Sequence, residues 1–254
     1  MESIAQIKAY YKKLDIYEYE NFVQKYNDDE REGVIKLVEA ATKKVKALEA
    51  ERLRIDKMKE FERRYEDCGY ICGIDEVGRG PLAGPVCAGA VILRKDTEIL
   101  YLNDSKKLSE KKREELYDVI MEKAVAAAVA FASPQRIDEI NILQADYEAM
   151  TEAVSLLKVR PDILLLDAVH VPQLEDYKQV SIIKGDAKSV SIAAASIIAK
   201  VTRDRLMKEL DEKYPQYGFA SNKGYGSQSH IEAIKKYGPC EIHRRSFIGN
   251  FISE

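Results

Sequence analysis

The sequence predicts an α/β protein, in which a mixed sheet carries helices on both faces and follows a helical extension. Two observations predict this fold. From residue 70 onward, short apolar runs alternate with amphipathic helical stretches, as in chains that build a sheet between helices. Before residue 70 there is no proline and there are only two glycines, in a segment rich in Glu, Lys, Arg and Ala. We therefore expect a helical extension over residues 1–69 and an α/β domain over residues 70–254.

The helical extension carries one narrow apolar face. Asp28 and Asp29 can cap the N-terminus of a long second helix. Along this helix, apolar residues recur at near-heptad spacing, namely Val34, Val38, Ala41, Val45, Leu48 and Ile55. Such a stripe docks on a neighbouring surface. It suits a cap packed on its own domain and an arm for a protein partner or a second copy equally well.

In the α/β domain, the order of the elements indicates how the sheet is built. Strands are expected at 70–75, 86–93, 124–131, 162–168 and 180–184, and helices at 109–123, 141–158, 189–214 and 229–237. Hairpin-like strands come first and helix-separated strands follow, which is typical of a sheet with both antiparallel and parallel pairs. Residues 224–254 are expected to form a loop, a short helix and a tail.

Composition and charge exclude several classes of protein. With 46% hydrophobic and 33% charged residues, the chain has the composition of a soluble globular protein, not of a disordered one. A net charge of −3 excludes a uniformly basic protein, so any nucleic-acid surface must be a local patch. The N-terminus has no apolar signal-peptide core, and no segment approaches the ~18 apolar residues of a membrane span. We expect a cytoplasmic protein without a membrane association.

The cysteines do not indicate a disulfide scaffold or a zinc site. There are four, which is too few for a disulfide-built fold. Cys68 and Cys72 stand in a CxxxC spacing, but the three histidines lie far from them in the sequence. We therefore expect ordinary thiols at these positions.

Carboxylates follow three apolar segments and suggest a metal-dependent chemistry. Asp75 and Glu76 end a strand before a glycine-rich loop, Asp167 closes the run Leu164–Leu166, and Asp186 stands between lysines before a long apolar helix. Carboxylates that converge at one point repel each other, and a divalent cation is the natural compensation. Oxygen ligands favour Mg²⁺ or Mn²⁺, and two such ions can hydrolyse a phosphodiester.

Each carboxylate also has a simpler interpretation. An Asp at a strand end is commonly a cap or turn residue. Asp75 and Glu76 are adjacent, and successive residues on a regular strand point to opposite faces. They can share a site only where the strand bends or ends, which Gly78 and Gly80 permit.

Four segments closely resemble the signature motifs of ribonuclease HII. They are GIDEVGRGPLAGPVCAGAVIL from residue 73, NDSKKLS from 103, GDAKSVSIAAASIIAKVTRDR from 185 and KGYGSQSHIEAIKKYGPCEIHRRSF from 223. The resemblance implies a ribonuclease H-like fold, with a five-stranded mixed sheet flanked by helices. It also implies that four residues form the catalytic and metal-binding set, namely Asp75, Glu76, Asp167 and Asp186. Asp204 is left out of this set, because its setting near Arg203 and Arg205 suggests an ion pair.

The resemblance further implies how a ribonucleotide is recognised. The loop Gly78, Arg79 and Gly80 would read the ribose 2′-hydroxyl, which backbone N–H and C=O groups can bind without reading sequence. Glycines there let the backbone approach a sugar, although a GRGP run can also be a simple tight turn. Tyr225 would stack on the following deoxyribose, although most tyrosines serve only in packing.

Basic residues form two clusters that could hold phosphates. The first comprises Lys106, Lys107, Lys111, Lys112 and Arg113, and the second comprises Lys184, Lys188, Lys200, Arg203 and Arg205. Helical lysines and arginines are usually a solvated face. We therefore assign a phosphate-binding role only to Lys106, Lys107 and Lys188, which lie in or beside the motifs.

We expect an Mg²⁺- or Mn²⁺-dependent endonuclease that cuts RNA in RNA–DNA hybrids and cuts 5′ to ribonucleotides embedded in duplex DNA. Two-metal catalysis would leave 3′-hydroxyl and 5′-phosphate ends. A monomer is expected, with a possible protein partner for the N-terminal helices. The alternatives are ribonuclease HIII, which cuts runs of ribonucleotides, a non-catalytic hybrid binder, and a helical adaptor led by the N-terminal region.

Overall fold

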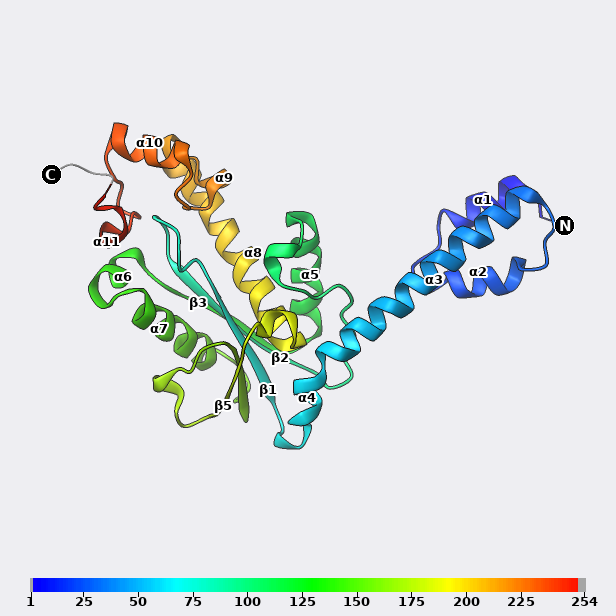
Figure 1. The fold of residues 1–254 in the computed structure, drawn as a ribbon, viewed down its shortest axis with the longest axis horizontal. Helices are drawn as coiled ribbons and strands as arrows, with labels where there is room; N and C mark the ends of the chain where they lie inside the picture. Colours follow the sequence, from blue (N-terminus) through cyan, green and yellow to red (C-terminus); the bar gives the residue numbers. More distant parts are fainter. Residues whose placement is uncertain (1, 251–254) are drawn as a thin grey trace. The chain divides into compact units, whose positions relative to one another are not determined.

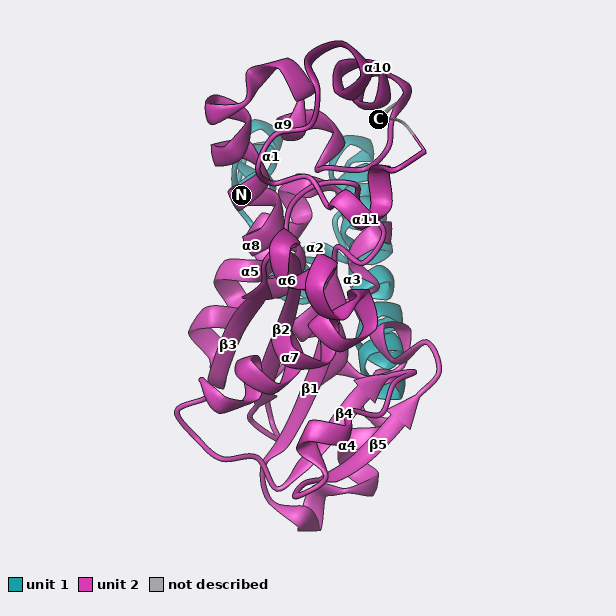
Figure 2. Cartoon of the chain, turned by 90° about the vertical axis from the view of Figure 1, so that its left-hand side faces the viewer, with its two compact units in different colours: residues 1–57 teal, residues 58–254 magenta. Residues whose placement is uncertain are grey.

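The computed structural model describes residues 2–250 and divides into two compact units (Figure 2). Unit 1 comprises Met1–Lys57 and unit 2 comprises Met58–Glu254, of which the first residue and residues 251–254 are not described. The end of the expected C-terminal tail therefore lies outside the described residues. No helix among residues 2–250 is long and apolar enough to cross a membrane.

From residue 2 onward, unit 1 consists of three helices, α1 (Ile4–Tyr11), α2 (Tyr19–Tyr26) and α3 (Glu32–Met58). The first half of the predicted apolar stripe lies in its core, where Val34 and Ala41 are buried. They pack with residues of the two short helices, among them Ile7, Tyr19, Phe22 and Tyr26. The long helix is thus the third and not the second, and this half of its stripe is covered by the preceding helices of the same unit.

Unit 2 contains a five-stranded sheet with the order β3-β2-β1-β4-β5. The strands are β1 (Ile71–Val77), β2 (Val86–Leu93), β3 (Ala124–Ala132), β4 (Ile163–Asp167) and β5 (Lys178–Ile182). β2 pairs antiparallel with both β1 and β3, whereas β4 pairs parallel with both β1 and β5. The expected mixed five-stranded sheet is confirmed.

The four helices expected in the α/β domain are all present in unit 2, together with shorter ones. The longer ones are α4 (Glu60–Arg64), α5 (Glu110–Lys123), α6 (Pro134–Ile140), α7 (Ile142–Ser155), α8 (Val190–Lys213) and α10 (Gln228–Tyr237). Within residues 58–250 there are also two four-residue helices, α9 (Phe219–Asn222) and α11 (Arg245–Ile248), and five short 3₁₀ turns, η1 (Glu66–Cys68), η2 (Ser105–Lys107), η3 (Pro172–Leu174), η4 (Gly185–Ala187) and η5 (Pro215–Tyr217). α6 is the longest helix that the sequence patterns miss; the side chain of Ser133 caps its start, and Pro134 occupies its first turn.

The two faces of the sheet are packed differently (Figure 1). On one face, Ala145, Ala149 and Met150 of α7 join the large apolar core with residues of β1, β2, β3 and β4. On the other face, α8 comes very close to β1 and β2. A β-carbon added at Gly73 would lie 2.1 Å from the carbonyl carbon of Ser191, and one at Gly89 would lie 2.4 Å from the carbonyl oxygen of Ala195. Small residues on both partners permit this approach.

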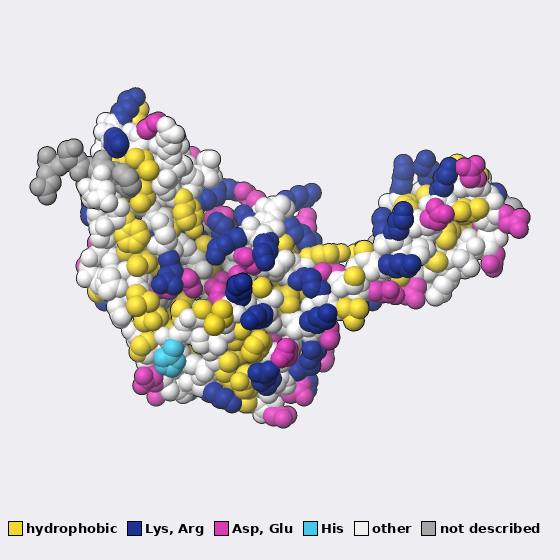
Figure 3. All heavy atoms as spheres, in the orientation of Figure 1, with side chains coloured by type: hydrophobic (Ala, Val, Ile, Leu, Met, Phe, Trp, Pro, Cys, Tyr) yellow, Lys and Arg dark blue, Asp and Glu magenta, His cyan; other side chains and the backbone are white. Residues whose placement is uncertain are grey.

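Charged side chains of both signs gather over α5 on the face seen in Figure 3. Arg205 pairs with Glu114 at 2.5 Å, and Lys208 pairs with Glu110 at 2.6 Å. These ion pairs join α8 to α5. Much of the basic charge in this region is therefore already partnered within the protein.

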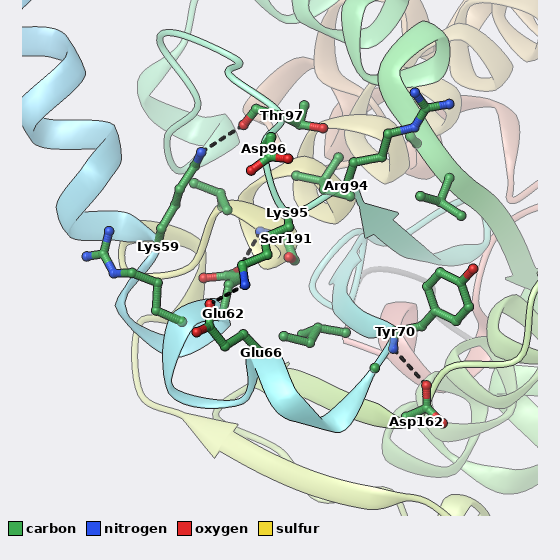
Figure 4. A pocket seen from close by; sticks show the side chains of 17 residues that line it. Lys59, Glu62, Glu66, Tyr70, Arg94, Lys95, Asp96, Thr97, Asp162 and Ser191 are labelled. Carbon is green, nitrogen blue, oxygen red and sulfur yellow. Dashed lines mark hydrogen bonds and ion pairs between the residues drawn. The ribbon is translucent and has the colours of Figure 1, made fainter.

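A cavity of about 950 Å³ lies at the end of the sheet where β1 and β4 begin (Figure 4). Its polar side chains are largely paired with each other or with backbone. Glu62 Oε1 accepts hydrogen bonds from Ser189 Oγ at 2.5 Å and from the backbone N–H of Ser191 at 3.0 Å. Asp162 Oδ2 accepts from the backbone N–H of Tyr70 at 2.7 Å. The cavity thus lies where α4 is hydrogen-bonded to the start of α8, away from the strand ends that carry Asp75 and Asp167.

Candidate active site

Two of the predicted carboxylates lie on neighbouring parallel strands. Ile74 of β1 is in register with Leu166 of β4, so Asp75 and Asp167 follow at equivalent positions. The carboxyl ends of parallel strands open at one edge of a sheet, which is a common place for a site in α/β proteins. Both strands are almost entirely buried up to this point.

Asp75 and Glu76 leave β1 toward opposite faces of the sheet. Strand β1 remains regular to Val77, with Asp75 opposite Gly89 and Glu76 opposite Ala88 on β2. On one face, the hydroxyl of Ser196 in α8 lowers the pKa of Asp75, whereas on the other the charge of Glu76 raises the pKa of Asp146 in α7. No bend separates the two residues, and the strand ends at Val77, directly before Gly78. Alternation along the strand separates them, as in any regular strand.

Asp186 reaches the same region from the short turn η4. Lys184, just before η4, adopts a left-handed backbone conformation with φ of 59°. The turn places the backbone N–H of Gly185 2.7 Å from Asp167 Oδ1, to which it donates a hydrogen bond. The link between β4 and η4 thus holds Asp167 and the segment that carries Asp186 together.

The electrostatics show that the four carboxylates share one region. Burial raises the pKa of Asp75 well above its usual range, and the charges of Glu76, Asp167 and Asp186 raise it further. Burial also raises the pKa of Glu76, against the lowering effect of Arg79, and Asp167 adds to the rise. Burial and the charges of Asp104 and Asp167 raise the pKa of Asp186. Asp167 therefore acts electrostatically on all three other carboxylates.

This donor set suits a hard divalent cation. It consists of carboxylate oxygens whose negative charges are costly to hold together without a cation. Among residues 2–250, no three His, Cys, Asp or Glu side chains are close enough to enclose one ion as they stand. The splaying of Asp75 and Glu76 is one geometric reason. The chemistry of the donors fits Mg²⁺ or Mn²⁺, with Asp75, Glu76, Asp167 and Asp186 as the residues that would hold them.

Two further carboxylates lie near the four and were missed by sequence reasoning. Asp104 precedes η2 and acts on Asp186, as noted above. Asp146 on α7 is completely buried, and neither of its carboxyl oxygens has a hydrogen-bond partner. It forms an ion pair with Arg79 at 3.7 Å. Burial, with the charge of Glu76, raises the pKa of Asp146 to about 8. Its position in an amphipathic helix gives no sequence signal of this setting.

The loop Gly78–Arg79–Gly80 begins directly after β1. Gly78 has a φ of 91°, and a β-carbon there would lie 2.3 Å from Nε of Arg203, so both conformation and space require glycine. The side chain of Arg79 is partly exposed and lies 3.6 Å from Glu76. The loop therefore adjoins the carboxylate group through Arg79.

Tyr225 lies beside this loop. It is 42% exposed, unlike most aromatic side chains of unit 2, and it follows the buried Gly224. A β-carbon added at Gly80 would lie 3.9 Å from Cε1 of the Tyr225 ring. The backbone N–H of Leu82 donates to the carbonyl of Gly224 at 2.8 Å, which fixes the two segments side by side.

The predicted phosphate-binding lysines are placed differently from one another. Lys106 lowers the pKa of both Glu76 and Asp186 through its charge, so it lies close to the carboxylates. Lys107 and Lys188 are exposed, on η2 and just after η4 respectively. Arg203 does not belong to a surface cluster, because it is completely buried.

Asp204 forms the ion pair expected of it, with partners other than those predicted. It pairs with Lys200 at 2.6 Å and with Arg113 at 3.6 Å. The four cysteines are free thiols, of which Cys72 and Cys87 are buried.

Comparisons with known families cover nearly the whole chain. Residues 72–250 match the family model of ribonuclease HII, and residues 3–66 match that of the ribonuclease HII N-terminal domain. Ribonuclease HII of Lachnoclostridium phytofermentans is 63% identical over 229 residues, which is 90% of each chain. Ribonuclease HII of Clostridioides difficile is 48% identical over 253 residues, which is 99% of each chain.

Solved structures give the same result. Ribonuclease H2 of Pyrococcus horikoshii is 30% identical, with a TM-score of 0.59 over 70% of this chain and 93% of that one. The ribonuclease HII of Archaeoglobus fulgidus, solved in complex with PCNA, is 28% identical, with a TM-score of 0.61 over 72% and 97%. Two family models, relatives of nearly equal length and these two solved structures agree, and the chain belongs to the ribonuclease HII family.

Proposed function

We propose that this ribonuclease cuts on the 5′ side of a ribonucleotide, in RNA–DNA hybrids and at single ribonucleotides embedded in duplex DNA. One observation carries the proposal. The carboxylates of β1, β4 and η4 share one region, and the loop Gly78–Arg79–Gly80 joins that region directly to the exposed ring of Tyr225. A group that can hydrolyse a phosphodiester thus adjoins a surface that can distinguish sugars.

In the proposed reaction a water oxygen bonds to phosphorus, the bond from phosphorus to the 3′ oxygen breaks, and that oxygen takes up a proton. The products are a 3′-hydroxyl and a 5′-phosphate. Two divalent cations bound by the four carboxylates would activate the water and stabilise the leaving oxygen. Lys106, whose charge acts on Glu76 and Asp186, would hold a phosphate of the cleaved strand. Lys107 and Lys188 would contact phosphates farther along the duplex.

The choice of substrate rests on the sugars at a junction. The 2′-hydroxyl both donates and accepts, so the backbone of the loop at Gly78 and Gly80 can bind it in any base sequence. Tyr225 presents an apolar face that suits the next sugar when it lacks a 2′-hydroxyl. A single ribonucleotide in DNA offers both features, whereas a uniform hybrid offers only the first.

The test compares two duplexes, one with a single ribonucleotide and one with a uniform RNA strand, in Mg²⁺ and in Mn²⁺. Tyr225→Ala should lower kcat/KM on the first duplex by about 10- to 100-fold, the loss expected for one stacking contact. It should affect the uniform hybrid less. Tyr237→Ala, which removes another exposed tyrosine, is the matched control and should change neither rate. If the wild type cuts only within runs of ribonucleotides, junction recognition is wrong and a ribonuclease HIII-like specificity holds.

A further inference from the structure

Two buried arginines hold the backbone around the proposed recognition loop. Arg244 donates to the carbonyls of Gly78 at 2.6 Å, Arg79 at 2.8 Å and Gly84 at 2.9 Å. Arg203 donates to three further carbonyls, those of Pro85, Lys223 and Ala83. Both side chains are fully buried. A buried cation is costly unless it is well compensated, and here backbone oxygens of the loop region supply that compensation.

Next to Arg244, His243 begins a chain of hydrogen bonds that ends at Tyr225. The backbone N–H of Cys240 points to His243 Nδ1 at 3.0 Å. His243 Nε2 lies 3.1 Å from His230 Nε2, and His230 Nδ1 lies 2.8 Å from the carbonyl oxygen of Tyr225. Both imidazoles are buried.

The two ends of this chain determine where its protons are. A backbone N–H can only donate, so His243 Nδ1 accepts and its proton is on Nε2. A carbonyl can only accept, so His230 carries its proton on Nδ1 and accepts at Nε2. The donation therefore runs from Cys240 through His243 and His230 to Tyr225, with both rings neutral. Burial, followed by the charge of His230, lowers the pKa of His243 to about 4, which agrees with a neutral ring.

Backbone contacts connect the carbonyls held by the two arginines with the hydrogen-bond chain from Cys240 to Tyr225. Ala83 and His243 form an antiparallel bridge, and the N–H of Arg244 donates to the carbonyl of Leu82 at 2.9 Å. On its other side, Leu82 donates to the carbonyl of Gly224. The segment that follows the loop thus lies between the C-terminal segment and the segment that carries Tyr225.

We propose that the dipeptide His243–Arg244 is a positioning element that holds the two halves of the recognition site in register. Arg244 fixes the carbonyls of Gly78 and Arg79, so that the loop presents its backbone to the 2′-hydroxyl. His243 acts through His230 on the carbonyl of Tyr225, so that the ring meets the next sugar. Neither residue touches the substrate. This inference rests on the proposed function of the loop and of Tyr225.

The experiment on the His243 side uses a pair of near-isosteric variants. In His243→Gln an amide nitrogen can replace Nε2 and still donate to His230, whereas His243→Asn keeps only the contact with Cys240. His243→Asn should lower kcat/KM on the single-ribonucleotide duplex about tenfold, as expected for one lost hydrogen bond, with a smaller effect on the uniform hybrid. His243→Gln should restore most of the loss. If His243→Asn fails to fold, His230→Gln against His230→Asn makes the same comparison, since only Asn keeps a donor toward Tyr225.

Variants of Arg244 are expected to affect cleavage of the two duplexes differently from variants of His243. Arg244→Lys keeps the charge but loses the planar set of donors, so it should lower cleavage of both duplexes, because both contain the 2′-hydroxyl. Arg245→Lys is the matched control, since Arg245 is exposed and adjacent, and it should change neither rate.

A double variant separates this proposal from the proposed function. If His243 acts through Tyr225, adding His243→Asn to Tyr225→Ala should cause no further loss on the single-ribonucleotide duplex. Additive losses would overturn the proposal, as would an unchanged junction preference in His243→Asn while Tyr225→Ala shows its effect. If Tyr225→Ala itself has no effect on that preference, the proposed function fails instead.

Discussion

Ionisable side chains in unit 2 are buried at several positions, and each has its own kind of compensation. Asp75 is buried among other carboxylates, which suits a cation. Arg244 is buried among carbonyls, and His243 is buried beside a second neutral imidazole. The carboxylates around Asp75 thus carry unbalanced negative charge. The charge of Arg244 is compensated by carbonyl oxygens, and His243 is neutral. The unbalanced group is where chemistry is expected.

The first prediction concerns this unbalanced charge. Asp75→Asn and Asp167→Asn should each lower the cleavage rate by about a hundredfold or more, because each removes a charged oxygen that would hold the cation. Asp75→Asn should also stabilise the metal-free fold, since burial and repulsion penalise the charged form. Asp162→Asn is the matched control at the opposite end of β4, where Asn can still accept from Tyr70. A rate within about threefold of wild type for Asp167→Asn would contradict the assignment.

A second prediction concerns pH and His243. Its pKa in the folded protein is about 4, below the ordinary value of 6.5, so between these pH values the unfolded chain binds more protons. Stability should therefore fall as pH falls through this window, by on the order of 2 kcal/mol between pH 6.5 and 5. Urea unfolding at several pH values measures the change. His243→Gln should lose less stability over this window than the wild type, and an equal loss would show that other groups cause the dependence.

At the scale of elements, the contact of α8 with the sheet positions the site. α8 carries Ser196 beside Asp75 and begins just after the turn that carries Asp186. Its approach to β1 depends on Gly73, where any side chain would meet the backbone of Ser191. The distance between helix and sheet thus controls how far apart Asp75 and Asp186 lie.

The third prediction tests this contact. Gly73→Ala should destabilise the fold by about 1–3 kcal/mol or more, because backbone and not a flexible side chain occupies the space. Cleavage should fall as well, since α8 must shift away from Asp75. Thermal unfolding and single-turnover rates measure both effects. Gly249→Ala is a control with open space around it, and it should leave stability within about 0.5 kcal/mol.

Much of this element-level arrangement was predictable from the sequence. The strands lie within a few residues of their predicted spans, because most of them are short apolar runs bounded by polar or turn residues. α6 was missed because seven residues are too few to show a helical pattern of apolar residues.

The site was predictable only in part. Motif resemblance supplied the four carboxylates, the loop and Tyr225, and the structure places them near one another. The burial of Arg203, Arg244 and Asp146 was not predictable, because charged residues in a helical or loop pattern read as solvated positions. Their surroundings come from segments far apart in the sequence, such as residues 78 and 244. The splaying of Asp75 and Glu76 follows from strand alternation, which the sequence did indicate.

At the scale of the whole molecule, the division between the two units does not coincide with the boundary expected at residue 69. Unit 1 ends at Lys57, and the segment from Met58 to Gly69 belongs to unit 2. In that segment, Glu62 accepts hydrogen bonds from Ser189 and Ser191 at the first turn of α8. A carboxylate at a helix N-terminus is favoured by the helix dipole, and here it comes from a different helix.

The last prediction follows from this difference between the two boundaries. A chain that begins at Met58 should fold and keep most of its turnover at saturating substrate, because the carboxylates, the loop and Tyr225 all remain. A chain that begins at Tyr70 loses Glu62 together with α4, and it should be less stable than the Met58 chain by about 2 kcal/mol or more, as for two hydrogen bonds to a charged group. Glu62→Gln in the Met58 chain isolates the contact and should account for part of that difference. Urea unfolding and single-turnover cleavage of the single-ribonucleotide duplex measure the outcomes. Equal stability of the two truncated chains would show that α4 does not support the start of α8. Loss of all turnover by a folded Met58 chain would instead place unit 1 within the catalytic machinery.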